Sequence, residues 1–175
     1  MNIEVNFPPV ATLLPHGGAM VLLDRLLAID DDSVCAEVTI RCASVFYDQA
    51  KAGVGAWVGI EYMAQAIAAH AGHAALKRGE PAGIGFLLGA RRYQAQHPLF
   101  PVGSVLHIHA RRALQGANGL MTFDCRIDIV AIVDSVEHGD GVLATASTAA
   151  TATVAVFKPL DAGVFLHDSV NGNGA

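Results

Sequence analysis

A single carboxylate stands in a strongly apolar stretch of the chain. Glu61 lies within AWVGIEYMAQAIAA (residues 56–69), where nearly every other residue is apolar. A carboxyl group in such surroundings loses water, which disfavours its charged form and raises its pKa. A carboxyl group tuned in this way serves as a general acid or base. We therefore take Glu61 as the principal catalytic candidate. The alternative is a place on the solvent face of a helix, which the spacing alone does not exclude.

Two further polar side chains could act with this carboxylate. Gln65 follows Glu61 at i+4, on the same face of a helix, where it could orient Glu61 or hydrogen-bond a substrate. His16 stands between Pro15 and the pair Gly17-Gly18, just before an apolar run. It is a candidate general base that could reach a site near the helix start. Its alternative role is to fix this part of the chain by hydrogen bonds.

A glycine-containing segment precedes the same helix. Gly53-Val54-Gly55 leads into Ala56 and Trp57, whose backbone N–H groups would be unpaired at a helix start. Such N–H groups, aided by the helix dipole, favour a developing negative charge, as an oxyanion hole does. The sequence therefore predicts substrate-binding roles for Gly53, Gly55, Ala56, Trp57 and Gln65.

The histidines do not indicate a metal site. His70 and His73 are spaced i, i+3, and His107 and His109 are spaced i, i+2, but neither pair has a cysteine or carboxylate in a recognised ligand pattern. No nucleophile elbow, phosphate loop or dinucleotide motif is present. We expect neither a metal nor a cofactor.

The order of elements predicts an α+β architecture. A helix over 56–77 and the strands on either side of it are expected to position these groups. Lys77, Gly79 and then Pro81 mark the end of the helix. In the helix, an apolar stripe recurs at helical spacing: Trp57, Ile60, Ala64, Ile67, Ala68 and Ala71. Strands are expected at 19–29, 34–40, 84–94, 105–114, 119–133 and 142–157, with loops at 46–55 and 98–103 and a turn at 137–141. One long helix wrapped by a mostly antiparallel sheet of five to six strands follows.

Composition limits the class of protein. The chain has 175 residues, of which 53% are hydrophobic and 15% charged, with a net charge of −5. This suits a single domain over 1–158, with a disordered tail over 159–175, and the apolar surplus predicts a subunit interface or an apolar pocket. The acidic balance argues against nucleic-acid binding. No apolar run could span a membrane, no signal peptide is evident, and three scattered cysteines fit reduced thiols in the cytoplasm.

Three blocks of sequence resemble the beta-hydroxyacyl-[acyl carrier protein] dehydratases, which have the hot-dog fold. They are LLPHGGAMVLLDRLL (13–27), VGIEYMAQAIAA (58–69) and FLLGARRYQAQHPLFPVGSVLHIHARR (86–112). The wording WVGIEYMAQAIA is most similar to the dehydratase-like subunits of aryl polyene biosynthesis. The resemblance implies a dimer, a thioester tunnel at its interface, and reversible loss of water from a 3-hydroxyacyl thioester. The thioester would be carried by acyl carrier protein or coenzyme A. It also implies that Glu61 is the family's catalytic carboxylate.

One departure from the family pattern leaves three hypotheses open. The family's base is a loop histidine, but VFYDQAKAGVG (45–55) contains none, and Tyr47 and Asp48 are not obvious replacements. In the first hypothesis His16 supplies the base and Glu61 the acid of a dehydratase. In the second the chain is a non-catalytic hot-dog subunit that pairs with an active relative. The third is an acyl thioesterase on the same fold, in which Glu61 activates water. A homodimer and a hetero-dimer are both compatible with the sequence.

Overall fold

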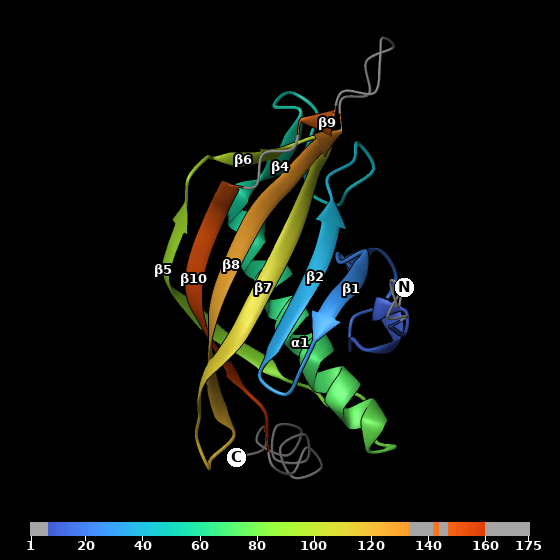
Figure 1. Ribbon diagram of the computed structural model, residues 1–175, viewed down its shortest axis with the longest axis vertical. Helices are drawn as coiled ribbons and strands as arrows, with labels where there is room; N and C mark the ends of the chain where they lie inside the picture. The colour runs from blue at the N-terminus through green and yellow to red at the C-terminus, as the bar shows by residue number, and fades with distance from the viewer. Residues whose placement is uncertain (1–6, 134–141, 144–146, 160–175) are drawn as a thin grey trace, which may run out of the picture.

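The structure is a computed structural model that describes residues 7–133, 142–143 and 147–159. Within these residues, one helix lies across the concave face of an antiparallel sheet (Figure 1). The expected turn at 137–141 and the expected disordered tail beyond 159 fall outside the described residues. Among the described residues, one hydrophobic core contains side chains from the helix and from the strands of the main sheet.

Six strands form the main sheet in the order β1-β2-β7-β8-β10-β5, and every neighbouring pair is antiparallel. Their bounds are β1 Arg25–Ile29, β2 Ser33–Thr39, β5 Phe86–Ala95, β7 Ser104–Gln115, β8 Leu120–Val133 and β10 Ser147–Phe157. A short β9 (Val142–Leu143) pairs with β8. The predicted number of strands and their antiparallel pairing are confirmed.

Three expected elements differ from the structure. The predicted strand 19–29 is only β1, because residues Gly18–Met20 form a short 3-10 turn (η2). The predicted loops 46–55 and 98–103 contain a second small sheet, made of β3 (Tyr47–Asp48), β4 (Gly53–Gly55) and β6 (Leu99–Pro101). The predicted strand 142–157 contains β9 and β10, which both pair with β8, and residues 144–146 between them lie outside the described residues.

The helix occupies the predicted stretch. A 3-10 turn, η3 (Ala56–Val58), leads directly into α1 (Gly59–Lys77). The end is built as expected: Gly79 takes a left-handed φ of 71°, and the N–H of Glu80 donates back to the Ala75 carbonyl. Glycine adopts this conformation without a steric penalty, so the chain can leave the helix sharply.

The face of α1 that packs on the sheet differs from the predicted stripe. Its buried side is formed largely by Tyr62, Met63, Ala66, Ile67 and Ala69. Apart from Ile67, the predicted stripe lies to one side of this face: Ala64, Ala68 and Ala71 are only half buried, and Trp57 is 64% exposed. Residue spacing predicts which face of a helix is apolar. It does not show whether that face contacts the sheet, a cavity or a partner chain.

Buried and partly exposed side chains alternate along β2 and the first part of β7. In β2 and β7 the side chains facing α1 are Val34, Ala36, Val38, Leu106, Ile108 and Ala110, and all are buried. Since successive side chains of a strand point to opposite faces, the residues between them lie on the outer face. That outer face carries Cys35, Glu37, His107 and His109.

Candidate active site

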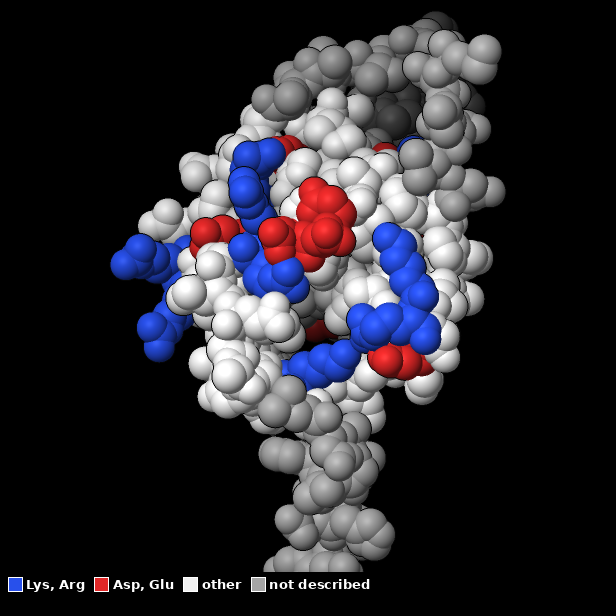
Figure 2. All heavy atoms as spheres, turned by 60° about the horizontal axis from the view of Figure 1, so that its bottom comes forward, with Lys and Arg blue, Asp and Glu red and all other residues white. Residues whose placement is uncertain are grey.

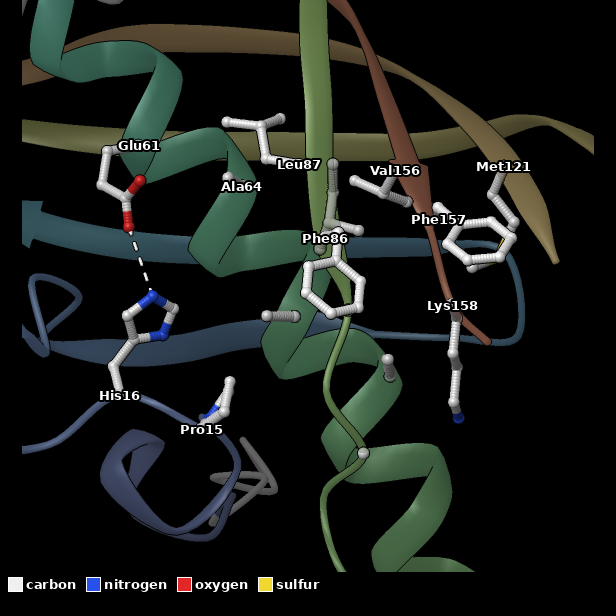
Figure 3. Close-up of a pocket in the computed structure, with 15 residues that line it drawn as sticks. Pro15, His16, Glu61, Ala64, Phe86, Leu87, Met121, Val156, Phe157 and Lys158 are labelled. Carbon is white, nitrogen blue, oxygen red and sulfur yellow. Dashed lines mark ion pairs between the residues drawn. The ribbon is translucent and has the colours of Figure 1, made fainter. Parts of the chain in front are cut away.

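Glu61 and His16 lie beside each other. Nε2 of His16 is 3.5 Å from Oε1 of Glu61, and the two side chains are 33% and 32% exposed (Figure 3). Glu61 sits in the first turn of α1, while His16 precedes η2. The structure thus brings together the two side chains proposed as acid and base. The apolar residues around Glu61 in the sequence predicted a carboxylate shielded from water. The Glu61 side chain is less shielded than that, because it lies at the edge of the core.

Close packing on α1 holds the segment that carries His16. Leu13 and Leu14 are buried in the core, and the backbone carbonyl of Leu13 lies directly against Gly72. A Cβ at position 72 would collide with this carbonyl. The absence of a side chain at Gly72 therefore lets the chain pass close to α1 shortly before it reaches His16.

Gln65 fixes the same segment from the other side. It is fully buried, and its Nε2 donates to the Met20 carbonyl at 2.7 Å, while its Oε1 accepts from the Leu22 N–H at 2.9 Å. Nε2 also donates to Oε1 of Glu61 at 2.9 Å, which is the i+4 contact that the spacing suggested. The hydrogen bonds from Gln65 occupy the Met20 carbonyl and the Leu22 N–H, which could otherwise pair with a neighbouring strand. This explains why β1 begins only at Arg25.

A cavity of about 160 Å³ opens beside this pair. Its walls are mainly apolar: Phe86 and Leu87 come from β5, Val156 and Phe157 from β10, and Met121 from β8 (Figure 3). The half-buried stripe of α1, which includes Ala64, Ala68 and Ala71, forms the opposite wall. Sequence analysis missed the contributions of the strands, because apolar strand residues that line a cavity look like core residues.

A second hollow of about 500 Å³ adjoins the first near the C-terminal end of α1. Four residues line both cavities: Ile67, Ala71, Met121 and Lys158. The hollow is lined by the basic Lys77, Arg78, Arg112 and Lys158 and by the acidic Asp30 and Asp31, and Figure 2 shows Lys and Arg side chains around a group of acidic ones on this face of the molecule. Arg78 pairs with Glu80 and Arg112 with Asp32, so part of this positive charge is already compensated.

The glycines predicted to bind substrate lie elsewhere. Gly53, Gly55, Ala56 and Trp57 do not line the cavity beside Glu61. A side chain at Gly53 would collide with the Phe100 backbone, and one at Gly55 with the Trp57 ring, so close packing explains both glycines. The N–H of Ala56 is not free for a substrate, because it donates to the Pro98 carbonyl at 2.9 Å. Of these residues, Ala56 therefore cannot offer its N–H to a thioester carbonyl in this arrangement.

The environment of His16 favours one arrangement of its proton. Nδ1 of His16 is buried and has no hydrogen-bond partner among the described residues. A buried N–H donor without an acceptor is costly. The neutral ring is therefore better accommodated with its proton on Nε2, where it faces Glu61. A base role at Nε2 needs the opposite tautomer and hence an acceptor for Nδ1.

The loop without a histidine provides no substitute base. Asp48 accepts hydrogen bonds from the N–H groups of Ala50 and Lys51, and it pairs with Nζ of Lys51 at 3.1 Å. Lys51 and these hydrogen bonds hold the pKa of the Asp48 carboxyl below its usual value. Asp48 therefore stabilises its own turn rather than a site of reaction.

A single helix wrapped by an antiparallel sheet, with a carboxylate and an imidazole at a cavity beside that helix, defines a hot-dog-fold protein of the dehydratase-like class. The chain belongs to the ApeP-like family, described as ApeP dehydratase, which matches residues 8–167. This confirms the resemblance to dehydratase-like hot-dog proteins of aryl polyene biosynthesis. Among curated protein sequences, no match is found.

Solved structures agree with this assignment. The chain is similar to one from the dehydratase heterocomplex ApeI:P of Xenorhabdus doucetiae, with 29% identity and a TM-score of 0.76, over 95% of this chain and 99% of that one. The E. coli PaaI protein from the phenylacetic acid degradation operon is 13% identical, with a TM-score of 0.52 over 76% and 81% of the two chains. A hypothetical thioesterase of Streptococcus pneumoniae, solved with coenzyme A, is 12% identical, with a TM-score of 0.52 over 77% and 84%. The last two share the fold alone.

Proposed function

We propose that this chain acts on 3-hydroxyacyl thioesters carried by acyl carrier protein, as one subunit of a hot-dog dehydratase of polyene-type biosynthesis. The observation that carries the proposal is the 3.5 Å approach of His16 to Glu61 beside an apolar cavity. This distance exceeds that of a good hydrogen bond, so neither group is fully engaged by the other. A substrate oxygen or proton can therefore meet both side chains.

In the reaction, the bond between Cα and its hydrogen breaks and the proton goes to Nε2 of His16, which requires that the neutral ring carry its own proton on Nδ1 and that an acceptor for it be supplied on assembly or substrate binding. The electron pair forms the double bond between Cα and Cβ. The bond from Cβ to the hydroxyl breaks as Glu61 donates its proton, and water leaves. Gln65 is a positioning residue in this scheme, because its Nε2 donates a hydrogen bond to Oε1 of Glu61 and so orients the carboxylate. General acid–base catalysis of this type contributes about 10²–10⁴-fold.

The partner we propose is a second, different hot-dog chain. The similar solved chain comes from a heterocomplex by its title. In this chain β5 ends the main sheet, and it exposes apolar side chains: Phe86, Leu87 and Leu88 are 41%, 43% and 59% exposed. An exposed edge strand with apolar side chains is suited to pairing with another chain. Because Phe86 and Leu87 also line the cavity, a partner on β5 would help to enclose the site.

Acyl carrier protein is the carrier that the charges favour. Lys77, Arg78, Arg112 and Lys158 line the hollow that adjoins the site, and basic groups attract an acidic carrier and its phosphate. We place the protein in the cytoplasm, where the three free cysteines would stay reduced. None of the described helices has both the length and the apolar character that crossing a membrane requires.

A second candidate function is that of a non-catalytic subunit. Two observations favour it: residues 45–55 contain no histidine, and Nδ1 of His16 has no acceptor among the described residues. In this case the chain would complete the interface of a catalytic partner. The thioesterase hypothesis has no specific support, since the thioesterase structures resemble this chain in fold only.

One experiment separates these functions. The chain is purified alone and with a co-expressed hot-dog partner, and each sample receives a 3-hydroxyacyl thioester on acyl carrier protein or on coenzyme A. Enoyl thioester formed by the pair, and lost in a pair with Glu61→Gln, supports the proposal. Full activity of the Glu61→Gln pair assigns the reaction to the partner and overturns the catalytic role. Release of free acid without enoyl product would establish a thioesterase instead.

A further inference from the structure

The outer face of the main sheet brings a thiol and two imidazoles together, far from the helix-facing cavity. In the pairing of β2 with β7, Cys35 lies opposite His109 and Glu37 lies opposite His107. One ligand atom from each of Cys35, His107 and His109 lies within 4.8 Å of the others. All three side chains are partly exposed, so an ion can reach them.

Both imidazoles are already held by carboxylates. Nε2 of His107 is 3.4 Å from Oε2 of Glu37, and Nε2 of His109 is 3.3 Å from Oδ2 of Asp128. In metal sites a ligating histidine commonly contacts a carboxylate through the ring nitrogen that does not bind the metal, which orients the ring and raises its basicity. Here Nε2 of each ring faces the carboxylate, so a metal ion would be bound by Nδ1. A carboxylate in this position can also enter the coordination sphere itself. The arrangement therefore supplies three ligands and two supporting groups from neighbouring strands.

The charges around the cluster permit a divalent cation. Glu37 is paired with Arg25 at 2.9 Å and Asp128 with Arg126 at 2.8 Å, so the carboxylates and guanidinium groups balance. Arg126 opposes a cation, since it lies close enough to affect both Cys35 and His109. A thiolate formed at Cys35 on binding would offset one of the two positive charges of the ion.

We propose that Cys35, His107 and His109 form a binding site for one divalent transition-metal ion of the zinc type, which links β2 to β7 on the outer face of the sheet. One thiolate and two imidazoles suit Zn²⁺, which takes sulfur and nitrogen ligands in a tetrahedral arrangement. The Asp128 carboxylate or a water molecule completes the four ligands. The role is structural, because this face is opposite the one that carries α1 and the pair His16 and Glu61. The inference is independent of the proposed reaction.

Cobalt(II) is the probe that tests this site, with the full chain purified without a polyhistidine tag. We expect uptake of one equivalent of Co²⁺, with the near-ultraviolet charge-transfer band of a thiolate ligand and the strong visible bands of a tetrahedral ion. Added Zn²⁺ should displace the cobalt. The melting temperature of the protein should rise with Zn²⁺, because an ion that binds only the folded state stabilises it.

Matched variants identify the ligands. Cys35→Ser should abolish the charge-transfer band, and the double variant His107→Gln and His109→Gln should lower the affinity at least about tenfold while the thiol remains. Cys42→Ser and His97→Gln change an exposed thiol and an exposed imidazole elsewhere, and both should bind as the unchanged chain does. Melting in the presence of a chelator shows that each variant is folded. No uptake by the unchanged chain, or an unchanged band in Cys35→Ser, overturns the proposal.

Discussion

Nε2 of His16 lies 3.5 Å from Oε1 of Glu61, although one residue precedes the first strand and the other begins the central helix. This proximity does not arise from local sequence. It depends on Gly72, which admits the Leu13 backbone, and on Gln65, which binds the backbone at Met20 and Leu22. The site is therefore as much a property of these two helix residues as of the reactive pair.

Replacing the carboxylate tests its part in proton transfer. Glu61→Gln keeps the shape of the side chain and an oxygen that can accept from Gln65, but it cannot donate an acidic proton. We expect enoyl thioester formation by the assembled pair to fall about 10²–10⁴-fold, with little change in melting temperature. The control is Glu80→Gln, an exposed carboxylate paired with Arg78. Equal losses in both variants would contradict a specific role for Glu61.

Removing the Gln65 amide should destabilise the fold. In Gln65→Ala the N–H of Leu22 and the carbonyl of Met20 lose their partners, and a fully buried side chain leaves a gap. Unpaired polar groups cost about 1–3 kcal/mol when buried, and these two backbone groups are partly buried. Urea unfolding should therefore show a loss of about 2 kcal/mol. The exposed Gln49→Ala serves as the matched control and should unfold as the unchanged chain does.

Replacing Gly72 in the helix by alanine should lower the stability of the fold, although this kind of change usually raises it. Alanine normally stabilises a helix interior by about 1 kcal/mol relative to glycine. At Gly72, however, the added Cβ would collide with the Leu13 carbonyl, so we expect Gly72→Ala to lower stability by about 1–3 kcal/mol. Gly17→Ala meets no atom within 4 Å and should be tolerated. A gain in stability for Gly72→Ala would show that the Leu13 segment does not lie on the helix.

Acid should destabilise the fold partly through His73. Its pKa is lowered from the usual 6.5, chiefly by burial and then by the charges of Lys77 and His70. The unfolded chain therefore binds a proton at His73 more readily than the folded chain does. Stability is retained above about pH 6.5 and falls as the pH drops through the lowered pKa. In unfolding experiments at several pH values, His73→Gln should lose less stability on acidification than the unchanged chain. The exposed His97→Gln should not.

The fold was predictable because its signals are local and periodic. The helix 59–77, with its end at Lys77 and Gly79, and the alternating strand β2 follow from residue spacing alone. The start of β1 was not predictable in this way. The side chain of Gln65, far along the sequence, binds the backbone at Met20 and Leu22 and so replaces strand pairing there.

The candidate site was predictable only in part, for a related reason. Glu61, Gln65 and His16 stood out by their chemistry, and the structure places them together. The glycines before the helix could not be assigned a role from residue type, because close packing and an oxyanion hole both favour glycine. Cys35 could not be connected with His107 and His109 until the register of β2 on β7 was known. Pairing across strands brings together residues whose spacing along the chain carries no pattern.

The hydrogen bonds of Gln65 and the contact at Gly72 also determine which segments of this protein can be exchanged with those of a relative. Residues 13–22 and the two helix positions depend on each other, so a chimera that takes the N-terminal segment from one relative and the helix from another would separate matched parts. Exchange of both together preserves the match. In this respect the two regions behave as one inherited unit, even though four strands, β1 to β4, lie between them in the sequence.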